Sequence, residues 1–375
     1  MFCDVDPGRN QYMLTGPFAR KGYDWWWHSF TARHETTGKE VPFFVEFFLI
    51  NPARGGSNAI LGQMEENRRA GLKPSYLMIK AGCWREKPLQ LHRFYAWDEV
   101  TIRKGAPFLV ATSDALCSDR HLNGRISVST EQAARPEMMC DEGTIEFDLD
   151  IEKIVPFNVG YGASAPFRML KAFEMYWHAA GMKSLYEGRI TLNGERYVVS
   201  KETSFGYADK NWGRGFTSPW VWLSSCNLTS NRTGKKLNNS VFDIGGGRPK
   251  IYFLALNRKL LSAFYYEGEE FEYNFSKFWT GTRTRFASKE TEKEILWHVR
   301  QENQDSVLDV QVRCKKSHML LVNYEEPDGR KRHNRLWNGG DGTGRIRLYR
   351  KTKDGLLLID DMKATHVGCE YGEFD

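Results

Sequence analysis

A short polar run, YADKN at residues 207–211, contains the side chains of this chain that are best suited to acid chemistry. If the run is extended, alternation along the strand places Tyr207, Asp209 and Asn211 on one face. A carboxylic acid held among aromatic rings has a raised pKa, because its charged form loses solvation, and it can protonate a substrate near neutral pH. A second interpretation is a surface turn, since glycine, aspartate and asparagine are common in turns and cap their own backbone.

Three tryptophans stand within or just after this run and are interpreted as core residues or as the wall of a pocket: Trp212, Trp220 and Trp222. The face of an aromatic ring attracts a cation, so rings beside an acid would stabilise a carbocation as it forms. Lys210 alternates with Asp209 and is expected to face the other way, paired with another carboxylate in a structural role.

Two apolar runs near the start of the chain predict a β-hairpin. They read KGYDWWWHSFTA at residues 21–32 and PFFVEFFLI at residues 42–50, and turn residues separate them. Glu46 stands inside the second run, and two interpretations stay open for it: a strand position facing solvent, or a pocket carboxylate near Asp209. His28 is similarly either a donor in the pocket or an ordinary strand residue.

The rest of the chain consists of short strand-like runs separated by turns, with scarcely any helix. Residues 143–151, for example, alternate apolar and polar side chains, and Asn193-Gly194 joins two alternating runs as a hairpin turn does. This pattern predicts an all-β fold, an antiparallel barrel or sandwich. The glycine-rich runs at 245–247 and 338–344 lack the context of a phosphate-binding loop, so no cofactor is expected.

Composition limits the classes of protein that this chain can be. Its 375 residues suffice for two domains, and 14% aromatic with 27% charged residues exclude disorder. The net charge of +6 is spread among acidic residues, so no nucleic-acid partner is expected. Apolar runs are too short for a membrane span, while peripheral membrane contact and the oligomeric state stay open. Seven cysteines without CxxC spacing predict no metal site, and with no apparent secretion signal they indicate the cytoplasm.

The polar run also belongs to a longer motif. It reads Tyr207-x-Asp209-x-Asn211-x-Gly213 and is preceded by WHAAGM at 177–182, GRI at 188–190 and NGERY at 193–197, and followed by Cys226-Asn227. Over roughly fifty residues this resembles the tocopherol cyclase-like family, which is related to carotenoid 1,2-hydratases and lipocalin-like Diels-Alderases. The hydratases resemble this chain in having aspartate at the position of Asp209, where the plant cyclases have glutamate.

The resemblance implies two tandem lipocalin-like antiparallel β-barrels with few short helices, at residues 1–185 and 186–375, and a pocket at or near their contact. It implies a cofactor-independent cyclase or hydratase that protonates a carbon–carbon double bond of a hydrophobic prenyl, quinone-like or polycyclic molecule. Asp209 would be the acid, and Tyr207 and His178 would position or recharge it. The expected substrate-binding residues are Trp177, Asn211, Trp212, Trp220, Trp222, Glu46 and His28. Two alternatives are a binding protein that leaves its ligand unchanged and a pericyclic cyclase that only folds its substrate.

Overall fold

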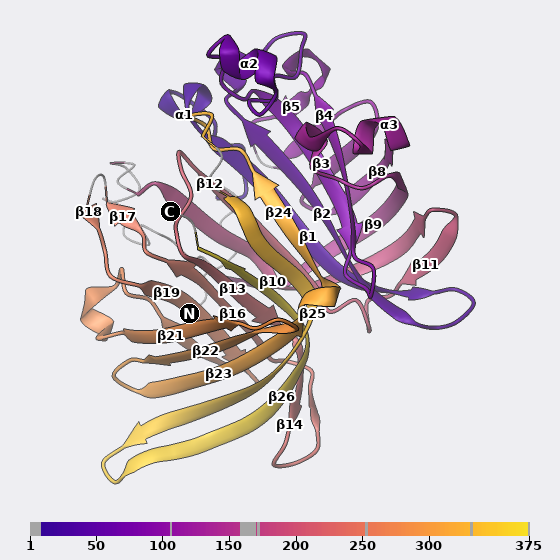
Figure 1. Ribbon diagram of the computed structural model, residues 1–375. Helices are drawn as coiled ribbons and strands as arrows, with labels where there is room; N and C mark the ends of the chain where they lie inside the picture. The colour runs from indigo at the N-terminus through magenta and orange to yellow at the C-terminus, as the bar shows by residue number, and fades with distance from the viewer. Residues whose placement is uncertain are drawn as a thin grey trace.

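The computed structural model describes residues 9–105, 107–157, 170, 173–251, 254–330 and 333–373. Nearly all regular structure in these ranges is antiparallel strand, which confirms the predicted all-β fold of two successive barrels with few short helices (Figure 1). The helices described are single turns: α1 (Pro17–Arg20), α2 (Glu65–Arg69), α3 (Thr130–Ala133) and the 3₁₀ turns η1 (Pro52–Arg54), η2 (Trp97–Glu99), η3 (Pro136–Met138), η4 (Phe278–Thr280) and η5 (Lys316–His318).

The first sheet runs in the order β4-β3-β2-β1-β11-β10-β9-β8-β7-β6-β5, and β12 pairs with both β1 and β10. Most neighbours in this order are also consecutive in the chain, as short connections in an antiparallel meander require. Its strands are β1 (Tyr23–His34), β2 (Glu40–Ile50), β3 (Tyr76–Cys83), β4 (Leu89–Tyr95), β5 (Thr101–Arg103), β6 (Leu109–Ala111), β7 (Ala115–Ser118), β8 (His121–Val128), β9 (Gly143–Phe157), β10 (Met175–Leu192), β11 (Glu195–Val199) and β12 (Gly206–Gly213).

Both predicted hairpins of this half are present. Strand β1 pairs with β2 so that Trp27 lies opposite Glu46, and β10 turns into β11 at Asn193 and Gly194. The φ angles of these two turn residues are 50° and 84°, the left-handed pair that a two-residue hairpin turn needs.

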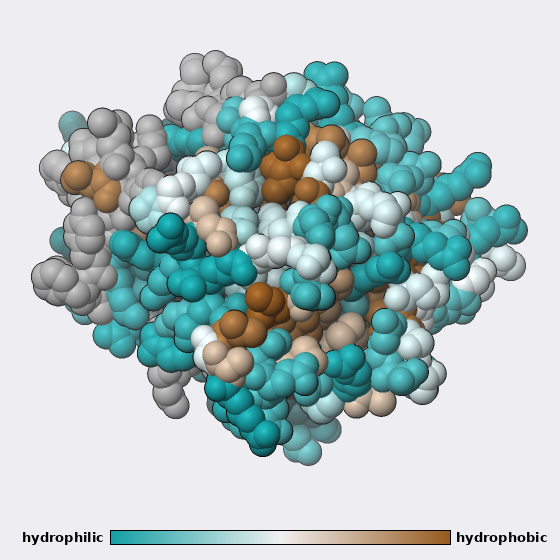
Figure 2. Space-filling model, turned by 90° about the horizontal axis from the view of Figure 1, so that it is seen from above, coloured by the Kyte–Doolittle hydropathy of each residue, from teal (hydrophilic) through white to brown (hydrophobic). Residues whose placement is uncertain are grey.

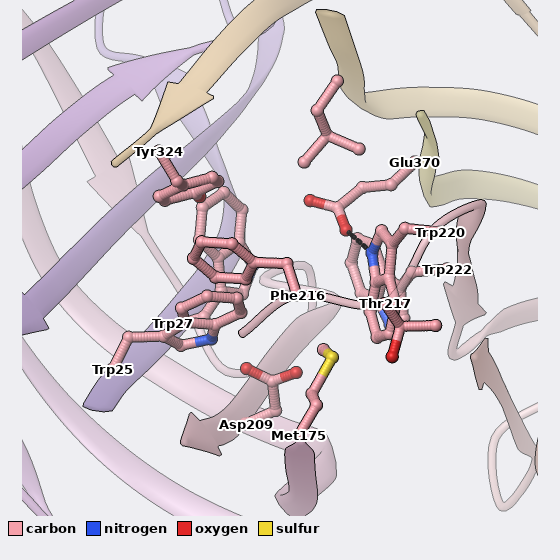
Figure 3. A pocket seen from close by; sticks show the side chains of 11 residues that line it. Trp25, Trp27, Met175, Asp209, Phe216, Thr217, Trp220, Trp222, Tyr324 and Glu370 are labelled. Atoms are coloured by element: carbon pink, nitrogen blue, oxygen red, sulfur yellow. Dashed lines mark hydrogen bonds between the residues drawn. The ribbon is translucent and has the colours of Figure 1, made fainter. Parts of the chain in front are cut away.

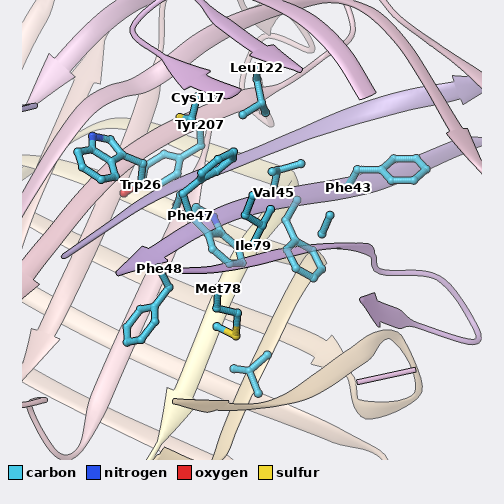
Figure 4. Close-up of a cluster of buried hydrophobic side chains, with 14 of the residues drawn as sticks. Trp26, Phe43, Val45, Phe47, Phe48, Met78, Ile79, Cys117, Leu122 and Tyr207 are labelled. Carbon is cyan, nitrogen blue, oxygen red and sulfur yellow. The ribbon is translucent and has the colours of Figure 1, made fainter. Parts of the chain in front are cut away.

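Both faces of the β1–β2 hairpin are covered, which explains its unbroken apolar runs. Phe48 of β2 and its neighbour Met78 of β3 lie on one face of the sheet, and Cys117 and Leu122, from strands further along the chain, lie on the other (Figure 4).

The second sheet runs β20-β19-β16-β13-β26-β25-β23-β22-β21, with β14, β15 and β24 attached to its sides. A separate short pair is formed by β17 (Lys250–Ile251) and β18 (Leu254–Ala255). The sheet's strands are β13 (Trp220–Ser225), β14 (Asn227–Ser230), β15 (Lys236–Leu237), β16 (Val241–Gly247), β19 (Lys259–Tyr266), β20 (Glu269–Tyr273), β21 (Arg283–Glu290), β22 (Glu294–Glu302), β23 (Ser306–Lys315), β24 (Met319–Tyr324), β25 (His333–Thr352) and β26 (Gly355–Gly372).

The change from one sheet to the other lies between Gly213 and Trp220, later than the expected boundary after residue 185. That boundary would cut through β10 (Met175–Leu192). Strands β10, β11 and β12 belong to the first sheet because they return to pair with one another and with β1. The Tyr-x-Asp motif is therefore the last strand of the first half.

Most of the surface seen in Figure 2 is hydrophilic, with apolar side chains in small separate groups. Among the described residues, no helix has the length and apolar character needed to cross a bilayer.

Candidate active site

A cavity lies where the two sheets face each other, and side chains from both sheets line it (Figure 3). Strands β1, β10 and β12 contribute from the first sheet, and β13, β24, β25 and β26 from the second. Rings make up most of the wall, and the two carboxyl groups in it come from opposite sheets. The lining residues are Trp25, Trp27, Met175, Asp209, Phe216, Thr217, Trp220, Trp222, Tyr324, Leu336 and Glu370.

Asp209 lies on β12 between β1 and β10, directly opposite Trp27 in the register. Its Oδ2 atom accepts hydrogen bonds from Trp177 Nε1 at 2.8 Å and from Tyr207 Oη at 3.1 Å. Its Oδ1 atom is shielded from solvent and has no hydrogen-bond partner among the described residues. Burial, and next the nearby Asp243 carboxyl, raise the pKa of Asp209 well above its ordinary value. The group is therefore an acid with one oxygen left for a substrate.

Tyr207 joins Asp209 to a second carboxyl group, Asp243 on β16. Its hydroxyl lies 3.1 Å from Asp209 Oδ2 and 3.2 Å from Asp243 Oδ2. A phenol has one proton to donate, so the second contact is a hydrogen bond only if one of the two carboxyls is protonated. Burial raises the pKa of Asp243 to about 8, although Trp222 Nε1 donates to its Oδ1 at 3.1 Å. Asp243 therefore keeps a proton near neutral pH, which it can donate to the phenol oxygen while the phenol donates to Asp209.

Glu370 on β26 lies across the cavity from Asp209 (Figure 3). Trp220 Nε1 donates to its Oε2 at 2.5 Å, and Asn338 Nδ2 donates to its Oε1 at 2.5 Å. Burial raises the pKa of Glu370 to about 7, against the lowering effect of these two donors. The carboxyl group can therefore exchange a proton under physiological conditions.

The structure corrects the expected contact between His178 and Asp209. His178 lies opposite Lys210 in the register, so both point away from the face that bears Asp209. His28 lies on that other face too, with its Nδ1 2.8 Å from the Tyr186 hydroxyl. Burial lowers the pKa of each histidine to about 3, which keeps it neutral. Lys210 pairs with buried Asp24, in agreement with its predicted structural role.

The predicted aromatic residues divide between the two faces of β12. Trp220 and Trp222 lie in the cavity wall, and Trp177 contacts the acid itself through its indole N–H. Trp212 lies on the opposite face, stacked on Tyr176 with ring centroids 5.4 Å apart, and does not line the cavity. Trp177, and not its sequence neighbour His178, therefore lies beside Asp209.

Asn211 shares the face of Asp209 but is not part of the cavity wall. Its Oδ1 accepts a hydrogen bond from Tyr23 Oη at 3.0 Å. The amide therefore positions a neighbouring ring of β1 and has no place in the wall beside a substrate.

Glu46 is fully buried, which rules out its interpretation as a strand residue facing solvent. Its Oε2 lies 2.9 Å from Lys80 Nζ and accepts a hydrogen bond from Tyr324 Oη at 2.9 Å. The same ammonium lies 3.9 Å from the centre of the Tyr324 ring. Glu46 therefore does not line the cavity itself. It positions Tyr324, which does line the cavity.

Sequence reasoning missed Asp243, Glu370 and the two cavity tryptophans of β1, Trp25 and Trp27. Asp243 carried a usable signal, because it stands between Phe242 and Ile244 in an apolar run, as Glu46 does in its own. No comparable signal marked Glu370. Within the described ranges, no group of three or more His, Cys, Asp or Glu side chains is arranged to hold a metal ion.

Fold and site together define a class: an all-β protein of two antiparallel halves with a carboxylic acid enclosed by rings between them. A family model described as Tocopherol cyclase-like matches residues 123–373, and the chain belongs to that family. The match includes β12, both carboxyl-bearing strands of the second sheet and the turn between the sheets.

Two plant proteins are similar to part of the chain. Tocopherol cyclase, chloroplastic, from Zea mays is 29% identical over 164 residues, which cover 44% of this chain and 31% of that protein. A probable tocopherol cyclase, chloroplastic, from Oryza sativa subsp. japonica is 28% identical over 159 residues, covering 42% and 30%. The matched part is thus about a third of the length of these relatives.

Among solved structures, kievitone hydratase from Nectria haematococca superposes with a TM-score of 0.43 at 11% identity, covering 98% of this chain and 92% of that one.

Proposed function

We propose that the protein adds an O–H group across a carbon–carbon double bond of a hydrophobic, prenylated molecule, with Asp209 as the proton donor. The reaction is a cyclisation when the hydroxyl belongs to the same molecule, and a hydration when it belongs to water. One observation supports this above all others: Asp209 Oδ1 is a shielded, unpartnered carboxyl oxygen in a cavity walled by aromatic rings.

The first step transfers the proton of Asp209 to one alkene carbon, so that the π electrons form the new C–H bond and the other carbon becomes a cation. The faces of Trp25, Trp27 and Trp222 would stabilise this cation without reacting with it. An oxygen lone pair then forms the C–O bond, and the oxygen loses its proton. Protons gained and lost are equal, so the addition needs no oxidant or reductant.

Tyr207 and Asp243 then restore the acid. After the transfer, Asp209 is an anion 3.1 Å from the phenol, which can donate its proton as it accepts another from protonated Asp243. Asp243 thus takes the recharging role that was expected of His178.

The cytoplasmic location stays a prediction, since the chloroplast is named only for the two plant relatives.

The substitution Asp209→Asn tests the proposal, because asparagine keeps an oxygen for Trp177 and Tyr207 and has no acidic proton. With 2-geranylbenzene-1,4-diol as the probe, which carries a phenol and an alkene, we expect turnover to chromanol to fall by about 10²–10⁴-fold. Binding, followed by tryptophan fluorescence, should stay within about threefold. Asp354→Asn, at an exposed turn, is the control. Normal turnover by Asp209→Asn would refute the role of this acid.

A further inference from the structure

We propose that Glu370 is a second catalytic residue of this cavity, the base that removes the proton from the attacking oxygen. This inference rests on the addition reaction proposed for Asp209. It also narrows the substrate class, because alkene and hydroxyl must lie between the two carboxyl groups at the same time.

The position of Glu370 suits a base. Asp209 and Glu370 line the same cavity but come from different sheets, β12 of the first and β26 of the second. Figure 3 shows the two carboxyl groups on opposite sides of the cavity, with the rings between them. A substrate bound between the two carboxyl groups would have one side toward Asp209 and the other toward Glu370. An acid and a base are both needed for the addition, and both places are filled by carboxyl groups.

The hydrogen bonds of Glu370 also suit a base. Both of its oxygens accept from N–H groups, Trp220 Nε1 and Asn338 Nδ2, each at 2.5 Å. The orientation of the Asn338 amide is fixed from behind, because Trp84 Nε1 donates to its Oδ1 at 2.9 Å. Indole and amide N–H groups cannot accept a proton, so these contacts favour the carboxylate form. A carboxylate oxygen has more than one lone pair, so each oxygen can also accept a hydrogen bond from a substrate O–H.

The surroundings of the two groups separate their roles. Asp209 has the Asp243 carboxyl as a near neighbour, which favours its neutral, proton-bearing form. Glu370 has two N–H donors and the Glu46–Lys80 pair near it. The two donors lower its pKa against the effect of burial, and within the pair Glu46 raises this pKa while Lys80 lowers it. Two carboxyl groups whose environments differ in this way are the usual basis of an acid and base assignment.

In the proposed step, the oxygen of the substrate hydroxyl, or of water, forms its bond to the cation while its proton moves to a Glu370 oxygen. Asp209 ends as a carboxylate and Glu370 as a carboxylic acid, so charge and protons balance. Proton exchange with solvent returns Glu370 to the carboxylate. Asp209 regains its proton from Asp243 through Tyr207, and Asp243 then takes up a proton from solvent, so that all groups return to their starting forms.

The test uses the full chain, 2-geranylbenzene-1,4-diol and heavy water. The wild-type protein should give chromanol carrying one deuterium. In Glu370→Gln we expect chromanol formation to fall by about 10²–10⁴-fold. In heavy water the acid of Asp209 carries deuterium, and in this variant it still adds that deuterium to the alkene. The cation then loses a proton from a neighbouring carbon and becomes an alkene again. Deuterium should therefore enter the recovered probe or its alkene isomers. Asp209→Asn should neither cyclise nor label the probe.

These outcomes separate the two proposals. If Glu370→Gln cyclises at the wild-type rate while Asp209→Asn does not, the base is not Glu370 and the acid stands. If Asp209→Asn cyclises normally, or if wild-type protein binds the probe without converting or labelling it, the proposed function itself fails. Glu370→Gln that neither cyclises nor labels would also overturn the base role, because it places Glu370 before the proton transfer.

Two further variants distinguish a base from a packing residue. Glu370→Ala leaves room for a small carboxylate, so added formate should restore chromanol formation, whereas acetamide should not. Failure of formate to rescue a folded Glu370→Ala would count against the base role. Glu325→Gln is the matched control: this glutamate is also buried, and Gly62 N–H donates to it, but it does not line the cavity. It should cyclise and label the probe as wild type does.

Discussion

Replacing Asp243 by asparagine should change how the stability of the protein depends on pH. Burial raises the pKa of Asp243 to about 8 in the folded protein, against an ordinary value of 3.8. Between these values the folded chain keeps the proton and the unfolded chain has released it. Stability from this group is therefore fully present below the unfolded pKa and is lost as the pH rises toward the folded pKa.

The size of the effect follows from the linkage of one proton. Each pH unit between the two pKa values removes about 1.4 kcal/mol, so about 3 kcal/mol is lost between about pH 5 and about pH 7. The asparagine side chain of Asp243→Asn has no proton to lose, and its amide can donate to Tyr207 as the protonated acid does while its oxygen accepts from Trp222. From about pH 5 to about pH 7, the free energy of unfolding of Asp243→Asn should therefore rise by this amount relative to that of the wild type.

Urea unfolding followed by tryptophan fluorescence, at three pH values from about 5 to about 7, measures both chains. Asp354→Asn, at an exposed turn, serves as the control and should follow the wild type at every pH. A difference between Asp243→Asn and wild type that stays constant over this range would refute the reasoning, because it would mean that Asp243 is ionised in the folded protein.

Three more predictions concern the surroundings of the acid. Tyr207→Phe removes the phenol between the two carboxyls. The kcat for 2-geranylbenzene-1,4-diol should fall about 10–100-fold with little change in KM, because the transfer of a proton from Asp243 to Asp209 is slowed. An unchanged kcat would exclude Tyr207 from this transfer. His178→Gln should leave the pH–rate profile unchanged, since His178 faces away from the cavity; a shifted limb would restore it to the mechanism. Lys80→Met should destabilise the fold by about 3–5 kcal/mol, because Glu46 is left buried without its partner; in urea unfolding, Lys80→Met with Glu46→Gln should recover part of this loss.

Local pattern predicted much of the site. The alternation of Tyr207 and Asp209 correctly placed both on one face of β12, and the two β1–β2 runs were correctly read as a hairpin. Strand period and turn residues are properties of neighbouring positions, so they can be read without knowing the fold. The resemblance carried by the motif then gave the family, which the family model confirms.

The partners of the acid depended on strand pairing. Whether Trp177 or His178 faces Asp209 depends on the register of β10 against β12, and a slip of one residue exchanges the two faces. The register shifts along β10 cannot be read from its sequence. The same holds for the boundary between the halves, because only pairing with β1 and β10 shows that β11 and β12 belong to the first sheet.

The amino-acid sequence by itself determined the strand-rich fold, the acid and the aromatic character of its surroundings, because these follow from residue type and spacing over a few positions. The tertiary structure alone decided which carboxyl groups meet. Asp243 reaches Asp209 through Tyr207, and Glu370 faces it from the last strand of the chain. Long-range pairing of the two sheets brings these groups together and shields them from water, and that shielding raises their pKa values.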